Sequence, residues 1–323
     1  MTSLYVDRRG VELKLDAEAL VFYENGERIG TVPLAPLSRI FLRGDITLSS
    51  SLLGKLGLAG IGVIILSGRK ATPSLLMARP HNDAARRIAH YRASQDAPFC
   101  LGFARGLVAD KIARQAAFLE SQKENHLMAR YELTRATRQL GGMLRQTQEM
   151  DSIARLRGLE GAAANTYFGA FAAIVPESLH FVGRNRRPPR DPLNAVLSLT
   201  YTLMHAEAVL ALYGCGLDPY IGFYHQLDFG RESLASDLIE PLRPEADGWA
   251  LRLFNQKALR AEDFSTTAEG CLLGKAGRER YYREYEAFVE HPRKQLEETA
   301  RELIARLQPH EVQESPEPPC PIT

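Results

Sequence analysis

The chain has 323 residues, of which 45% are hydrophobic and 24% are charged. These values are ordinary for a globular protein, and the length allows two domains with a real core, so a disordered chain is excluded. The net charge is only +1, so no overall positive field attracts polyanions, and any nucleic-acid surface must be local.

Residues 1–80 predict a small β-rich domain. Asn25-Gly26 is a strong hairpin signal, and Ser49–Leu58 predicts one helix among the strands. Close spacing of the strands favours a compact sheet or sandwich rather than βαβ units. The strand-prone runs are Ser3–Val6, Val11–Leu15, Ala19–Tyr23, Arg28–Val32, Arg39–Leu42 and Gly62–Leu66.

Residues 81–308 predict a larger all-helical domain, because helix formers dominate 83–148 and proline is almost absent there. Further helices are expected over 151–176, from Asp191-Pro192 to Gly214, where Asp is an N-cap before Pro, and over 278–307. Residues 309–323 hold five prolines and predict a disordered tail. The expected fold class is therefore α+β, with a β domain followed by a helical domain.

Several classes of site and location are disfavoured. The four cysteines (Cys100, Cys215, Cys271 and Cys320) form no Cys-x-x-Cys pair, which argues against a zinc knuckle and fits a reducing cytoplasm. The first ten residues do not read as a signal peptide. The apolar run Leu56–Leu66 is too short to cross a bilayer, so no membrane association is expected.

Three separated residues are candidate metal ligands: Glu160, His225 and Glu240. Glu160 follows Gly158 in a run of small residues, which predicts close approach of another backbone and burial of the carboxylate. His225 follows an aromatic, glycine-containing loop, and Glu240 precedes Pro241. Each has an ordinary alternative, a solvated glutamate or a histidine satisfied in the core.

Asp237 precedes Glu240 by three residues and shares its helix face. It is expected to be either a weaker fourth ligand or an acceptor that orients His225; a solvated acidic face is the alternative. Carboxylates with one imidazole suit Mg²⁺ or Mn²⁺ better than structural zinc.

The helix after Pro192 carries one polar stripe, made of Asn194, Ser198, Tyr201 and His205 at spacings of four, three and four. A polar stripe on an otherwise apolar helix indicates a polar pocket, unless that side faces solvent. Asn194 and Tyr201 are expected to support the ligands by hydrogen bonds.

The segment 183–192 contains four arginines. Their guanidinium groups match the geometry of a phosphate; the alternative is a surface loop whose charges only keep it soluble. They are predicted to bind the phosphate backbone of a nucleic acid. There is no Walker-type loop, so nucleotide hydrolysis is not indicated. The arginines are Arg184, Arg186, Arg187 and Arg190.

At these segments the chain resembles the CRISPR-associated protein 1 family, the integrases of spacer acquisition. The matching motifs are Leu159-Glu160-Gly161 with Tyr167-Phe168, Arg186–Pro189 with Asp191–Asn194, Gly222–His225 and Ser233–Pro244, with a weaker match at Phe254-Asn255 and Glu262–Phe264. Tyr224 stands where a smaller apolar residue is often found.

The resemblance implies that Glu160, His225 and Glu240 are catalytic metal ligands with Asp237 beside them. It also implies a homodimer that assembles with the small second adaptation protein. Because the edges of its short strands need covering, the β domain is expected to carry the dimer interface. The expected activity is joining of 3′-hydroxyl DNA ends to a repeat array by transesterification. A structure-selective metal-dependent DNA nuclease and a non-catalytic DNA-binding scaffold remain alternatives.

Overall fold

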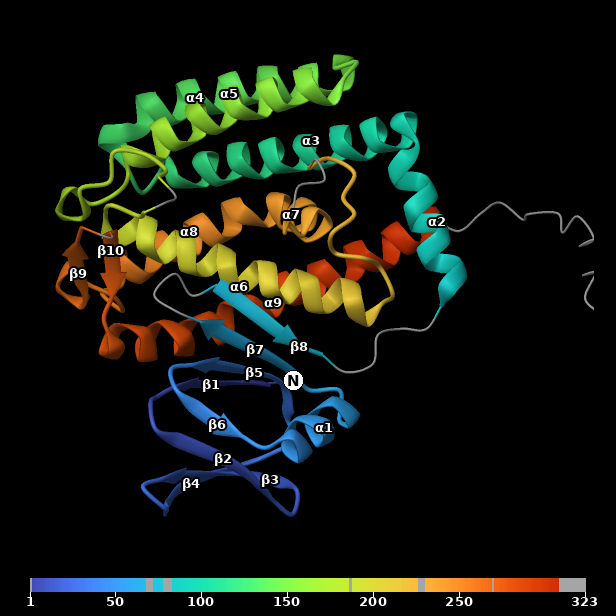
Figure 1. Ribbon diagram of the computed structural model, residues 1–323. Coiled ribbons are helices and arrows are strands. Elements are labelled where there is room, and N and C mark those ends of the chain that lie inside the picture. Colours follow the sequence, from blue (N-terminus) through green and yellow to red (C-terminus); the bar gives the residue numbers. More distant parts are fainter. Residues whose placement is uncertain are drawn as a thin grey trace, which may run out of the picture.

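The computed structural model describes residues 2–67, 72–77, 83–185, 188–225, 230–268 and 270–307. A β-rich N-terminal part is followed by a mostly helical part, as predicted, and Figure 1 shows the strands gathered below the helices. The proposed tail at 309–323 lies outside the described residues.

The N-terminal strands form two four-stranded sheets with the orders β1-β5-β7-β8 and β4-β3-β2-β6. Apolar side chains of both sheets and of α1 share a separate core, which includes Val6, Leu13, Leu20 and Leu56. The strands are β1 Thr2–Asp7, β2 Val11–Asp16, β3 Ala19–Glu24, β4 Glu27–Pro33, β5 Leu37–Arg43, β6 Ile46–Leu48, β7 Gly62–Ser67 and β8 Thr72–Leu76, with helix α1 at Ser50–Leu58.

The predicted hairpin is present, because β3 and β4 pair antiparallel around Asn25 and Gly26, whose φ angles are +53° and +83°. The expectation that βαβ units are absent was wrong. Strand β5 pairs parallel with β7, and α1 lies in the connection between them. A parallel pair needs such a crossover connection. The hairpin signals in the sequence indicate only which consecutive strands pair antiparallel.

The helical part comprises α2 Ala84–Gln95, α3 Ala97–Gln122, α4 Arg130–Gln146, α5 Ile153–Ala172, α6 Pro192–Gly214, α7 Ser233–Ile239, α8 Arg243–Asn255 and α9 Lys275–Leu307, with short 3₁₀ turns η1 Leu127–Ala129, η2 Thr147–Glu149, η3 Glu177–Leu179, η4 Glu240–Leu242 and η5 Ala261–Asp263. One antiparallel hairpin, β9 Phe264–Thr267 with β10 Gly270–Leu273, also belongs to it. The sequence did not reveal this hairpin, so the part is mostly rather than wholly helical.

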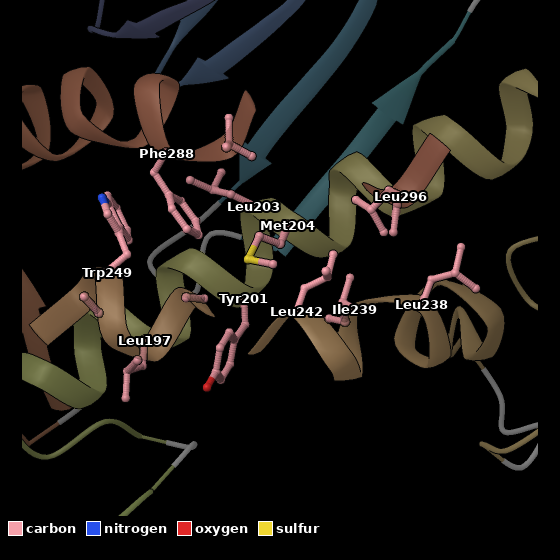
Figure 2. Packing of buried hydrophobic residues seen from close by; sticks show 14 of the residues in the cluster. Leu197, Tyr201, Leu203, Met204, Leu238, Ile239, Leu242, Trp249, Phe288 and Leu296 are labelled. Atoms are coloured by element: carbon pink, nitrogen blue, oxygen red, sulfur yellow. The ribbon is translucent and has the colours of Figure 1, made fainter. Parts of the chain in front are cut away.

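Helix α6 runs through the centre of the helical part, and Figure 2 shows its Leu197, Leu203 and Met204 in the same cluster as Leu242 and Phe288. Asp191 caps the helix by accepting a hydrogen bond from the Asn194 N–H at 2.8 Å. By length and composition α6 could cross a membrane, but 61% of its apolar window is buried inside the protein. Burial of this kind is typical of a core helix.

A buried ion network joins the β-rich part to the helices. Glu207 of α6 is 1% exposed and pairs with Arg39 of β5 at 2.5 Å and with Arg293 of α9 at 2.7 Å. Glu286 of α9 accepts hydrogen bonds from the Tyr5 hydroxyl and from Arg293. The network therefore links β1 and β5 of the sheet to α6 and α9 through buried charged groups.

Candidate active site

Asp237 holds the loop that carries His225. Its fully buried carboxylate accepts hydrogen bonds through Oδ2 from the backbone N–H groups of Phe223 at 2.9 Å and Tyr224 at 3.1 Å. Oδ1 accepts from the His225 backbone N–H at 2.9 Å and from its Nδ1 at 2.6 Å. Since Nδ1–H donates to Asp237, the Nε2 lone pair is left for another partner. This geometry favours the orienting role for Asp237 over that of a ligand.

Gly222 begins this loop because nothing larger fits there. A Cβ atom on it would lie 2.8 Å from Asp237 Oδ2 and 2.9 Å from Ser233 Cβ, well inside van der Waals contact. The glycine that precedes the aromatic residues in the sequence is therefore required by the close approach of Asp237.

Glu160 of α5 and Glu240 of η4 converge on one ammonium group. Lys111 of α3, whose side chain is 8% exposed, makes a short contact with Glu160 Oε1 and donates to Glu240 Oε2 at 2.6 Å. Arg243 lies 3.0 Å from the other oxygen of Glu240. Burial raises the pKa of Glu240, but Arg243 and Lys111 outweigh it and lower the pKa to about 2. Glu240 is therefore a carboxylate at neutral pH.

His225 and Tyr224 border the two carboxylates. His225 Nε2 lies 4.0 Å from Glu240 Oε1, and the Tyr224 hydroxyl donates to Glu160 Oε2 at 2.7 Å. Burial, followed by the charge of Glu160, raises the pKa of Tyr224 far above its usual range. Tyr224 therefore remains a hydrogen-bond donor to Glu160.

Two of the three predicted ligands, Glu160 and Glu240, thus meet at one position that the Lys111 ammonium group occupies, and His225 Nε2 lies 4.0 Å from Glu240. Within the described ranges, no group of three His, Cys, Asp or Glu side chains stands ready to hold a metal ion. The carboxylate oxygens of Glu160 and Glu240 instead meet at Lys111 Nζ. Two carboxylates beside a free imidazole nitrogen are the donor set of Mg²⁺ or Mn²⁺. The residues fit a divalent ion at this point once the Lys111 ammonium group withdraws.

A cavity of about 150 Å³ opens beside the carboxylates, and three cationic side chains line it: Lys111, Arg184 and Arg243. Both guanidinium groups also lie over the Tyr201 ring, Arg243 at 4.5 Å and Arg184 at 5.2 Å from its centroid. Stacked guanidinium groups keep their N–H edges in a fixed orientation, which suits a phosphate.

Asp247 of α8 lies at the floor of this cavity, and its carboxylate accepts a short hydrogen bond from the Tyr201 hydroxyl. Burial raises its pKa from 3.8 to about 6, although the Tyr201 hydrogen bond and Arg184 act in the opposite direction. Folded protein therefore holds this proton more tightly than unfolded protein. Stability falls as the pH rises from about 4 through about 6.

We expect Asp247→Asn to remove that pH dependence. Relative to wild type, its free energy of unfolding should increase by about 1 kcal/mol between about pH 5 and about pH 7.5. Urea unfolding at both pH values measures the difference. Asp110→Asn, at an exposed acid that pairs with Arg114, is the control and should differ from wild type by the same amount at both pH values. A pH-independent difference for Asp247→Asn would contradict the assignment.

The predicted supporting residues separate into different roles. Tyr201 lines the cavity, whereas Asn194 shapes the arginine segment: its Oδ1 accepts from Arg184 Nη1 at 2.7 Å, and its Nδ2 donates to the Gly183 carbonyl at 2.9 Å. His205 pairs with Glu232 at 3.0 Å and does not line this cavity. The polar residues of this stripe therefore lie in three different surroundings and do not form one pocket.

The arginines of the segment 183–192 that the structure describes also lie in different surroundings. Arg184 is directed inward, donating to Asn194 and to Ser198 Oγ at 3.1 Å, whereas Arg190 is exposed. Arg186 and Arg187 lie outside the described residues. Of the arginines in the described part of the segment, only Arg190 is exposed, as expected for a charged surface loop.

The expectation that another backbone packs closely against the small residues around Glu160 was wrong. Gly158 and Gly161 are exposed, and a Cβ at either would meet nothing within 4 Å, so no second backbone packs on them. Gly161 instead lines the cavity beside Glu160. Small residues here leave room for the cavity, and Glu160 itself is only partly buried.

Lys111, Arg243 and Asp247 were missed as site residues. A signal for Lys111 existed, because it lies among Val108, Ile112 and Leu119 on the buried face of α3. A lysine on an apolar helix face needs a buried partner, but the sequence does not say which carboxylates provide it.

Known proteins are similar to this chain over most of its length. Residues 4–287 match the family described as "CRISPR associated protein Cas1". A relative from Thermodesulfovibrio yellowstonii, "CRISPR-associated endonuclease Cas1 1", is 39% identical over 296 residues, covering 91% of this chain and 93% of the relative.

Three solved structures share the fold. A CAS1 protein from Thermotoga maritima superposes with a TM-score of 0.82 at 23% identity, covering 98% of this chain and 100% of that one. A casposase bound to integration product gives 0.79 at 20% identity, covering 98% and 96%. A Cas6-RT-Cas1–Cas2 complex gives 0.79 at 23% identity, covering 95% of this chain and 35% of that one.

Proposed function

Because the chain belongs to the Cas1 family of CRISPR-associated proteins, we propose that it is the integrase of CRISPR adaptation, which joins the 3′-hydroxyl ends of short DNA fragments to a repeat array. One observation carries the proposal: Glu160 and Glu240, from distant parts of the chain, meet at one cation position beside an arginine-lined cavity.

Glu160, Glu240 and His225 Nε2 would hold a Mg²⁺ or Mn²⁺ ion. When bound, such an ion supplies Lewis-acid stabilisation of charge on the phosphate oxygens and lowers the pKa of a bound hydroxyl. Asp237 contributes by keeping the His225 ring oriented with Nε2 toward the carboxylates. Tyr224 does the same for Glu160 through its hydroxyl.

The cavity would seat the scissile phosphate. Arg184 and Arg243 are placed to bind its non-bridging oxygens, and Tyr201 keeps both guanidinium groups in position. In the reaction the 3′-oxygen of the fragment forms a new bond to phosphorus while the bond to the 3′-oxygen of the target strand breaks. One phosphodiester replaces another, so no nucleotide triphosphate is needed. Fixing both strands in line lowers the barrier by proximity.

The proposed partners are DNA, the small second CRISPR adaptation protein and a second copy of the chain. Related structures are described as a casposase with integration product and as a Cas1–Cas2 complex. Strand β4, at the edge of its sheet and largely exposed, is an edge that pairing or coverage would protect, which supports a dimer interface in the β-rich part. The described cysteines Cys100, Cys215 and Cys271 are free, in keeping with the proposed cytoplasmic location.

The proposal is tested with a short fragment and a duplex that carries a repeat. Incubation with Mn²⁺ should yield a joined product, detected as a longer labelled strand on a denaturing gel. A fragment that ends in a 3′-deoxy sugar should yield none, because it lacks the nucleophile. Shortened strands with either fragment, and no joined product, would favour the nuclease alternative. Binding without any product, with or without metal, would favour the scaffold.

The arginine segment is expected to bind DNA backbone rather than bases. Arg187→Ala together with Arg190→Ala should weaken binding to all DNA sequences alike. The slope of log affinity against log salt should fall by roughly two, since each lost phosphate contact removes about 0.9. Fluorescence anisotropy across a salt series measures it. An unchanged slope would show that the segment is only a solvated surface, and exposed Arg130→Ala is the control.

A further inference from the structure

Lys111 is a charged and almost buried residue to which the proposed chemistry gives no task. Its side chain is 8% exposed, and its ammonium group contacts Glu160 and donates to Glu240 at 2.6 Å. Lys111 also lines the cavity of about 150 Å³ that opens beside these carboxylates. The same side chain therefore borders both the proposed metal position and the proposed phosphate position.

A lysine and a divalent ion cannot hold the same carboxylate oxygens at once. The ion would bring two positive charges to the place where the Lys111 ammonium group lies, and like charges at contact distance repel strongly in a buried setting. Helix α3 packs against α5, η4 and α8, so its backbone is held in place (Figure 1). The lysine side chain has a flexible four-carbon stem. Binding of the ion should therefore turn the ammonium group aside and leave the helix where it is.

Gln115 offers the displaced ammonium group a second partner. It lies one helical turn after Lys111 on α3, and side chains four residues apart on a helix are neighbours. Gln115 is 3% exposed and lines the same cavity, yet its Oε1 has no hydrogen-bond partner among the residues that the structure describes. A buried amide oxygen without a donor is unfavourable. An ammonium group, which has three N–H donors, would satisfy it.

The cavity has both the space and a use for this group. A water-sized group needs about 10–15 Å³ of such space, so about 150 Å³ admits an ammonium group beside a phosphate. Arg184 and Arg243 already provide two cations there. A phosphodiester carries one negative charge, and it gains a second as the attacking 3′-oxygen bonds to phosphorus. A third cation would therefore stabilise the transition state more than it stabilises bound DNA.

We propose that Lys111 is a catalytic residue with two positions. It bridges Glu160 and Glu240 until a divalent ion binds, and it then turns into the cavity, where Gln115 positions its ammonium group against the scissile phosphate. The proposal rests on the proposed function. Lys111 contributes positive charge and hydrogen bonds to the non-bridging oxygens and transfers no proton. The 3′-hydroxyl of the fragment loses its proton to solvent as its oxygen bonds to phosphorus, and the 3′-oxygen that leaves the target strand takes one up.

Lys111→Met separates this role from simple obstruction of the ion. Without the competing ammonium group, Mn²⁺ should bind about tenfold more tightly or better, as measured from the free-ion signal in electron paramagnetic resonance without DNA. At saturating Mn²⁺ the kcat of strand transfer should nevertheless fall by about a hundredfold, while the affinity for DNA stays within about threefold of wild type. Lys123→Met, at the C-cap of the same helix, is the control and should match wild type in all three measurements.

The results that would overturn the proposal differ from those that refute the proposed function. Tighter Mn²⁺ binding with unchanged or faster strand transfer would show that Lys111 only obstructs the ion. Unchanged or weaker Mn²⁺ binding would show that Lys111 does not hold the position of the ion. Failure of the wild type to join strands would refute the proposed function, whereas the Mn²⁺ affinities would still decide whether Lys111 yields to the ion.

Gln115→Leu tests the second position without disturbing the first. The Gln115 Oε1 accepts no hydrogen bond from the described residues, so the variant should be at least as stable as wild type in EDTA. It should bind Mn²⁺ about threefold more weakly, because the displaced ammonium group loses its partner, but it should not change the Mn²⁺ affinity of Lys111→Met. Equal weakening in both backgrounds, or none in either, would overturn the role of Gln115. Gln139→Leu, at an exposed glutamine of α4, is the control.

Discussion

Glu160→Gln and Glu240→Gln should each abolish strand transfer while leaving the fold intact. Both substitutions keep the size of the side chain but remove the charge that a divalent ion requires. Losing about 4 kcal/mol of transition-state stabilisation slows a reaction by about three orders of magnitude. Joined product is quantified with a labelled 3′-hydroxyl fragment in Mn²⁺, and His225→Ala should have an effect of similar size.

A matched control is available on α8. Glu245→Gln alters a partly exposed glutamate that pairs with His291 at 2.9 Å and does not line the cavity beside the carboxylates, so it should retain wild-type rates. Circular dichroism establishes that each variant is folded. Wild-type strand transfer by purified Glu160→Gln protein would refute the site.

Lys111→Met should make stability depend on divalent metal. Without the ammonium group, Glu160 and Glu240 repel each other in a largely buried setting, although Arg243 still pairs with Glu240. Breaking a buried pair by removing one partner costs about 3 kcal/mol or more, so the melting temperature should fall by several degrees in EDTA.

Adding Mn²⁺ should restore much of that loss, because the ion can take the position that Lys111 occupied. The Mn²⁺-induced rise in melting temperature is therefore expected to be larger for Lys111→Met than for wild type. Lys123→Met is the control at the C-cap of the same helix, since Lys123 pairs with exposed Glu120 at 2.5 Å. An equal Mn²⁺ effect in wild type and Lys111→Met would show that the carboxylates do not bind the ion where Lys111 lies.

Most of the secondary structure was predictable because its signals are local. The Asn25-Gly26 turn and the Asp191-Pro192 helix start depend on neighbours within a few residues, and both are present. Strands β6 and β8 were missed, and so was the β9–β10 hairpin. They are short, and their pairing partners decide whether they form strands at all. The parallel pairing of β5 and β7 was also beyond local signals, since it depends on a crossover.

The sequence by itself determined the fold class, the family resemblance and three residues that lie together, because motif residues keep their identity and order. Only the tertiary structure decided what surrounds them. Lys111 meets Glu160 and Glu240 because α3 packs against α5 and η4, and no pattern within α3 records those partners. Likewise Asp237 could be a ligand or an orienting group by spacing alone. The packing of the 222–225 loop on α7 favours the second role, because its four hydrogen bonds use both carboxylate oxygens.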